Sequence, residues 1–134
     1  MHDLPMTFEL WVLFAATFWG LVHISAASFS FKSQVGNEYT AGSRDEGLQP
    51  KGLAGRLNRA QRNFMETYPL FAVLAILLYL SGRAGDLSHW GAWMYILGRV
   101  IYLPLYASGI AWVRSICWAF ATLGLVLVGV QILL

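Results

Sequence analysis

The segment that decides the fold is RLNRAQRNFMETYPLF, residues 56–71, in which a basic stretch runs directly into apolar sequence. At 100° per residue, four polar side chains of this segment share one helix face within about 80°: Arg56, Arg59, Asn63 and Glu66. Residues 68–80 carry no charge, but they are too few to cross a hydrocarbon core, which needs about 20 helical residues. The helix must therefore extend back through Glu66, which places a carboxylate at membrane depth.

The composition is that of a membrane protein. Hydrophobic residues make up 57% of the 134 residues and charged residues only 12%, whereas soluble domains have about 25% charged residues. The mean hydropathy is +0.56. The net charge is +2 and the cations cluster in one segment, so no nucleic-acid-binding face is expected. The single cysteine, Cys117, excludes an intrachain disulfide, and the histidines lack metal-ligand spacing, so no metal site is expected.

The apolar runs predict an all-α fold: an integral membrane four-helix bundle that forms one domain over residues 1–134. The expected membrane-spanning helices cover residues of about 10–31, 56–81, 90–108 and 111–134. In the first of them Ala16 and Gly20 are four residues apart, a spacing of small residues that can seat another helix. His23 is the only ionisable residue of that span, and we expect a hydrogen-bonded packing role for it rather than a ligand role.

The polar segment 32–55 is predicted to be the one large loop. In it or just after it lie six of the nine basic residues: Lys32, Arg44, Lys51, Arg56, Arg59 and Arg62. Because loops rich in lysine and arginine stay on the cytoplasmic side, this loop is expected to be cytoplasmic and both chain termini to lie outside.

The third expected span carries an arginine, Arg99, at its middle. An arginine at the centre of a membrane helix costs about 3 kcal/mol and needs a partner. At about 1.5 Å per residue from the cytoplasmic helix ends, Glu66 and Arg99 lie at the same depth. By the same count, Asn63 lies at the depth of Tyr102, and Arg59 lies close to the depth of Tyr106. Two interpretations stay open here: an ion pair inside the bundle, or a polar ligand-binding cleft that opens to the cytoplasm.

The segment 56–71 resembles a conserved region of the MAPEG family, the membrane-associated proteins in eicosanoid and glutathione metabolism. The family pattern Arg-x-x-Arg-Ala-x-x-Asn-x-x-Glu-x-x-Pro-x-Phe is matched by Arg56, Arg59, Ala60, Asn63, Glu66, Pro69 and Phe71. A second conserved region of the family is similar to Arg99, Tyr102 and Tyr106, followed by Arg114. The sequence SRDE at residues 43–46 is similar to an Asn-Arg-Asp-Asp element of bacterial members, microsomal glutathione transferase-like proteins.

The resemblance implies a homotrimer in a bacterial inner membrane that binds glutathione, as co-substrate, between its subunits. It implies a transferase or peroxidase, acting in detoxification on lipophilic electrophiles or lipid hydroperoxides that arrive from the bilayer. Glutathione carries two carboxylates, an ammonium group and a thiol, so its site needs cations and a carboxylate. The glutathione-binding residues implied are Arg59, Gln61, Asn63, Glu66, Arg99, Tyr102 and Tyr106.

Arg114 is the residue expected to act in catalysis. In the family an arginine near this position stabilises the glutathione thiolate, and a cation beside sulfur lowers the pKa of a thiol. The spacing of eight residues from Tyr106 departs from that of the mammalian members, while the Arg114–Ser115 pair is similar to that of the prostaglandin synthases. The alternative for Arg114 is an anchor at the cytoplasmic membrane surface. For the whole chain, the alternatives are a small four-helix transporter and an inactive family member that serves as an interaction module.

Overall fold

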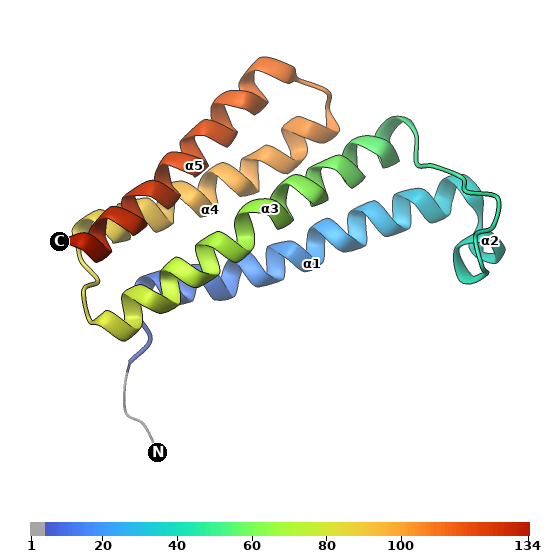
Figure 1. Ribbon diagram of the computed structural model, residues 1–134. Helices are drawn as coiled ribbons and strands as arrows, with labels where there is room; N and C mark the ends of the chain where they lie inside the picture. Colours follow the sequence, from blue (N-terminus) through green and yellow to red (C-terminus); the bar gives the residue numbers. More distant parts are fainter. Residues whose placement is uncertain (1–4) are drawn as a thin grey trace.

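The structure, a computed structural model, describes residues 5–134, and it is helical throughout apart from turns and one loop (Figure 1). Its five helices are α1 (Phe8–Val35), α2 (Asn37–Ala41), α3 (Gly52–Ser81), α4 (Asp86–Ala107) and α5 (Ala111–Leu133). The prediction of an all-α fold is confirmed. Three of the helices, α1, α3 and α5, are long and apolar enough to cross a membrane. The fourth long helix, α4, has 22 residues, carries Arg99 and three tyrosines, and is not among these candidate spans.

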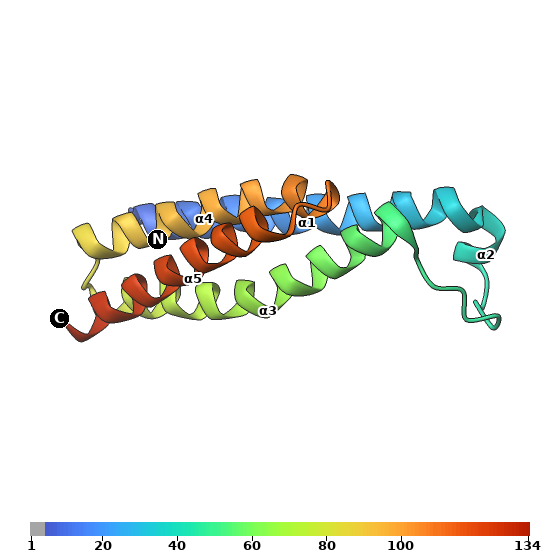
Figure 2. The same cartoon turned by 90° about the horizontal axis from the view of Figure 1, so that it is seen from above.

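The loop predicted over residues 32–55 is much shorter in the structure. α1 continues to Val35, α3 already begins at Gly52, and the short α2 occupies part of the segment between them. Both α1 and α3 extend beyond the turn between α4 and α5 at the end that carries α2 (Figures 1 and 2). A loop was predicted because the polar segment 32–55 has no apolar helix face to bury.

The start of α1 also differs from the prediction. Thr7 caps the helix, since its side chain accepts a hydrogen bond from the Leu10 amide (3.3 Å). The first turn therefore includes Glu9, which is only 2% exposed and accepts a hydrogen bond of 2.6 Å from Ser88 Oγ at the start of α4. His23 is thus not the only ionisable residue on α1. Because α1 was expected to begin at about residue 10, two residues later than it does, this contact between α1 and α4 was not predicted.

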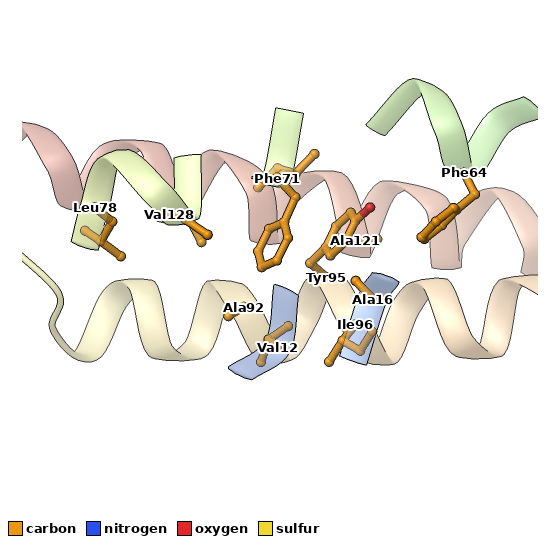
Figure 3. Packing of buried hydrophobic residues seen from close by; sticks show 12 residues of the cluster. Val12, Ala16, Phe64, Phe71, Leu78, Ala92, Tyr95, Ile96, Ala121 and Val128 are labelled. Carbon is orange, nitrogen blue, oxygen red and sulfur yellow. The ribbon is translucent and has the colours of Figure 1, made fainter. Parts of the chain in front are cut away.

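The core lies where α1 and α3 pack against α4 and α5 (Figures 1 and 3). The ring of Phe71 on α3 stacks on that of Tyr95 on α4, with centroids 4.5 Å apart. Ala16 and Gly20 are buried, and a Cβ atom added at Gly20 would lie 3.3 Å from Cε1 of Phe64. The predicted seat for another helix is confirmed, and α3 occupies it.

Glycines bring α4 and α5 together. A Cβ atom added at Gly124 on α5 would lie 2.4 Å from the carbonyl oxygen of Gly91 on α4, and one at Gly98 would lie 2.8 Å from the Ala121 Cβ. Both distances are shorter than atoms tolerate, so the two backbones touch at these points. Close approach of small residues is how membrane helices gain packing energy in the absence of a hydrophobic driving force.

We expect Gly124→Ala to destabilise the fold by about 2 kcal/mol, because its Cβ must push two helix backbones apart. Gly129→Ala is the matched control on the same helix, since its Cβ would meet nothing closer than 3.8 Å. Both substitutions replace glycine by alanine and so raise the helix propensity equally. The difference between the two unfolding free energies therefore measures the effect of overpacking alone. Chemical unfolding in detergent measures it, and equal stability of the two variants would show that the α4–α5 contact is not tight.

Candidate functional site

A pocket of about 220 Å³ lies where α3, α4 and α5 meet. Its lining residues are Asn63 from α3, Tyr102 and Tyr106 from α4, and Arg114, Ser115 and Trp118 from α5. Helix geometry explains the grouping, since residues three or four apart project from the same face. Polar side chains from three helices therefore converge on one place near the end of the bundle where the α4–α5 turn lies.

Arg99 lies behind this pocket and is completely buried. Its guanidinium carbon is 4.3 Å from the ring centroid of Tyr102 and 5.5 Å from that of Phe64. Nη1 donates a hydrogen bond of 2.7 Å to Oδ1 of Asn63, but Nε and Nη2 have no hydrogen-bond partner in residues 5–134. A buried guanidinium with two groups of free N–H donors is costly, and no acceptor among the described residues offsets that cost.

A direct ion pair between Glu66 and Arg99, one of the two interpretations left open by the sequence, is not found among the described residues. The side chain of Glu66 is exposed at the edge of the polar face of α3. The side chain that accepts a hydrogen bond from Arg99 is that of Asn63, one helical turn earlier. Within a single chain Glu66 and Arg99 therefore form no direct ion pair, although the charge of Glu66 acts on the Arg99 guanidinium from a longer distance.

Tyr106 lies between two further arginines. Nε of Arg59 donates a hydrogen bond of 3.2 Å to the hydroxyl of Tyr106. The guanidinium carbon of Arg114 is 4.4 Å from the centroid of the same ring. The rings of Tyr102 and Tyr106 are 5.5 Å apart, so a cluster of arginines and tyrosines runs from Arg99 to the pocket mouth. Within the part of the chain that the structure describes, no carboxylate forms an ion pair with these arginines.

The structure places the residues of the predicted site in two groups. Those in or against the pocket are Arg59, Asn63, Arg99, Tyr102, Tyr106 and Arg114. Glu66 is exposed, but near enough for its charge to act on Arg99 and Tyr102. Gln61 lines a different cavity on the other side of α3. Arg56 is used structurally, because its Nε donates a hydrogen bond of 2.9 Å to the carbonyl of Ala107 and so caps the end of α4.

Several aromatic side chains at the site were missed by the sequence reasoning. Trp118 lines the pocket one turn after Arg114, a spacing that could have revealed it. Nε1 of Trp19 donates a hydrogen bond of 3.2 Å to the carbonyl of Arg99.

His23 packs as predicted, with its ring stacked 4.8 Å from that of Phe64. The expected hydrogen bond of His23 is absent, because neither ring nitrogen has a partner among the described residues.

The comparison with known proteins identifies a family. No curated protein and no solved structure matches the chain. A family model, described as the MAPEG family, matches residues 7–134 and so covers every helix that contributes to the pocket. The chain therefore belongs to the MAPEG family.

Proposed function

We propose that the protein is a membrane-bound, glutathione-dependent transferase or peroxidase that acts on lipophilic electrophiles or lipid hydroperoxides. The observation that carries this proposal is the cluster of three guanidinium groups, of Arg59, Arg99 and Arg114, around one pocket without a carboxylate partner among the described residues. Such a site calls for an anion with more than one charged group. Glutathione, with two carboxylates and an ionisable thiol, has that chemistry, and it is the ligand on which the family's metabolism centres.

Each group of the pocket has a role in this proposal. Arg59 and Arg99 bind the two carboxylates through their planar N–H donors, and Asn63 and Tyr102 donate hydrogen bonds to the peptide. Arg114, at the mouth, stabilises the thiolate. The thiol proton passes to water, the thiolate attacks the electrophilic carbon, and the leaving group departs with the bonding electrons.

The site is completed, in this proposal, by a second copy of the chain. Glu66 is exposed on α3 among exposed apolar side chains such as Met65 and Leu70. A carboxylate that faced lipid there would be costly, whereas in a homotrimer it would meet the glutathione ammonium at a neighbouring subunit. Gln61, on the opposite side of α3, would reach glutathione only across such an interface. The segment that holds α2 would be cytoplasmic, both termini outside, and the membrane a bacterial inner membrane.

We expect the protein to be trimeric in mild detergent and the exposed face of α3 to lie at the subunit interface. In a background in which Cys117 is replaced by alanine, Met65→Cys should crosslink into covalent dimers with a short bifunctional thiol-reactive reagent, and native mass spectrometry of the uncrosslinked protein should give the mass of a trimer. Val126→Cys on α5, which is also exposed, is the control and should crosslink little. Only monomers in both variants, together with a monomeric mass by native mass spectrometry, would contradict the shared site.

The experiment that tests the function is the ultraviolet absorbance of the thiolate when glutathione is added to the purified protein at neutral pH. We expect an absorbance increase that saturates with glutathione, because a cation beside the sulfur favours the thiolate. The S-methyl form of glutathione should compete for the site and give no signal. A transporter or an inactive scaffold would bind without forming thiolate, so a flat absorbance at saturating glutathione would refute the enzyme proposal.

A further inference from the structure

The pocket between α3, α4 and α5 has an aromatic wall on its α5 side. Of the six described residues that line it, only Trp118 has no hydroxyl, amide or guanidinium group. Trp118 follows Arg114 by four residues, so the two side chains lie on the same face of α5. Since α5 runs away from the α4–α5 turn (Figure 1), Trp118 lies about 6 Å deeper in the bundle than Arg114. A thiolate held at Arg114 would therefore have this ring on its deeper side.

The indole ring of Trp118 contacts the pocket and also reaches the outer surface of the bundle. The residue lines the pocket, yet 39% of its surface is exposed. The large side chains that are exposed before and after it on α5 are apolar, among them Ile116 and Phe120. The same ring thus connects the apolar surface of α5 with the pocket, on the side from which a lipophilic molecule would enter.

One turn deeper on α5 lies a hydroxyl group without a partner. Oγ1 of Thr122 is buried and makes no hydrogen bond with any described residue. Ser115, the other hydroxyl residue of α5, donates to the carbonyl of Ala111 (3.2 Å). A buried hydroxyl without a partner costs free energy, so its proton is available to an oxygen that a ligand brings.

The three side chains form one stripe along α5. Arg114, Trp118 and Thr122 follow one another at intervals of four residues and share an arc of about 80° on the helix surface. From the first to the last the stripe covers about 12 Å along the helix axis. In order of depth it offers a cation for sulfur, a flat ring and a hydrogen-bond donor.

We propose that Trp118 and Thr122 form the acceptor subsite, and that they select a planar electrophile whose attacked carbon is conjugated to a carbonyl or nitro group, in preference to a hydroperoxide. This inference rests on the proposed function, because it needs the thiolate at Arg114. The flat π-system of such a molecule stacks on the indole ring. Its carbonyl or nitro oxygen, at the end remote from sulfur, accepts a hydrogen bond from the Thr122 hydroxyl.

The Thr122 hydroxyl lies where charge develops in this reaction. The sulfur forms a bond with the electrophilic carbon, and the displaced π electron pair moves through the conjugated system to the carbonyl or nitro oxygen. A hydrogen bond from Thr122 stabilises the charge on that oxygen. The adduct of an unsaturated carbonyl compound then takes up a proton from water, which replaces the proton that the thiol released. The adduct of a halonitroarene instead expels halide with the carbon–halogen bonding pair.

A small hydroperoxide uses neither group. Tert-butyl hydroperoxide has no flat π-system to stack on Trp118. Sulfur takes the hydroxyl group from its O–O bond, and the bonding pair leaves with the butoxide oxygen, which then takes up a proton from water. That oxygen stays next to the sulfur, near Arg114 and remote from Thr122. The two residues therefore act on one class of acceptor and not on the other.

Steady-state kinetics at saturating glutathione tests the proposal with two acceptors, a chlorodinitrobenzene and tert-butyl hydroperoxide. We expect wild type to use the nitroarene with the higher kcat/KM. Trp118→Leu should lower the ratio of the two kcat/KM values about tenfold, mainly by raising KM for the nitroarene, because the stacking is lost. Trp118→Phe should keep most of the ratio. Trp112→Leu is the matched control: it replaces an 85% exposed tryptophan of α5 that does not line the pocket, and it should keep the wild-type ratio.

The role of Thr122 is tested by a pair of variants. Thr122→Val keeps the shape of the side chain and removes the hydroxyl, and it should lower kcat for the nitroarene about tenfold with little change in KM. Thr122→Ser restores the hydroxyl and should recover most of kcat. A hydroxyl with a purely structural role would affect the turnover of both acceptors alike.

The thiolate absorbance of each variant reports the folded, glutathione-loaded protein, and turnover is corrected for it. The inference is overturned, with the proposed function intact, if wild type forms thiolate and prefers the hydroperoxide. It is also overturned if Trp118→Leu and Thr122→Val leave the nitroarene kinetics unchanged or lower the turnover of both acceptors equally. A wild type that forms no thiolate and converts neither acceptor would refute the proposed function itself, and the inference with it.

Discussion

Replacing Arg114 by alanine is expected to lower turnover with a halonitrobenzene electrophile by about 100-fold, the usual cost of removing one preorganised charge partner. Glutathione affinity should change only a few-fold, because Arg59 and Arg99 still bind the carboxylates. Raising the pH should partly rescue the variant, since hydroxide then supplies the thiolate that the cation no longer favours. Arg114→Lys should fall between wild type and Arg114→Ala, because it keeps the charge and loses the planar fork.

The competing explanation is that Arg114 only anchors α5 at the membrane surface. It predicts poor insertion of Arg114→Ala and normal turnover for each correctly assembled molecule. Lys51→Ala, which removes a cation from the same side of the membrane outside the pocket, should then reduce insertion to a similar extent. Turnover corrected for folded protein across a range of pH separates the explanations, and undiminished corrected turnover of Arg114→Ala would rule out the catalytic role.

Helix geometry explains why much of the site was predictable from the sequence. The rise and rotation per residue are fixed by the backbone, so the pairing of Arg59 with Tyr106 follows from counting inward from two helix ends. The structure places these two side chains in hydrogen-bond contact, and Asn63 beside Tyr102 in one pocket. Depth along a helix bundle can therefore be read from sequence to within about one turn.

The sequence does not show which edge of the polar face of α3 is turned towards the core. Asn63 and Glu66 differ by only about 60° around α3, yet one reaches the buried Arg99 and the other is exposed. The rotation of α3 is set by its packing on α1, where Phe64 fits against Gly20, and no periodicity in a single helix records that contact. A helix start is predicted only to within one or two residues because helix ends fray, and so the Glu9–Ser88 contact was missed.

Replacing Arg99 by methionine is expected to weaken glutathione binding by at least about 100-fold, or about 2.7 kcal/mol. The ligand-free protein should be as stable as wild type or more stable. The reason is that the Arg99 side chain is fully buried with one hydrogen bond, to Asn63, so the charge carries a desolvation cost that a bound anion would offset. Methionine fills the volume of the arginine stem and carries no charge.

Thermal unfolding with and without glutathione, together with calorimetry, measures both effects. Wild type should be strongly stabilised by glutathione and Arg99→Met hardly at all, because stabilisation by a ligand follows its affinity. Arg83→Met is the control: its guanidinium is exposed and donates a hydrogen bond to the carbonyl of Ile132 at the far end of α5, so glutathione affinity should be normal. A ligand-free Arg99→Met that is markedly less stable, with unchanged glutathione affinity, would mean that stacking on Tyr102 and Phe64 alone retains the arginine. The buried charge would then belong to the packing of α3 against α4 and not to the binding of an anion.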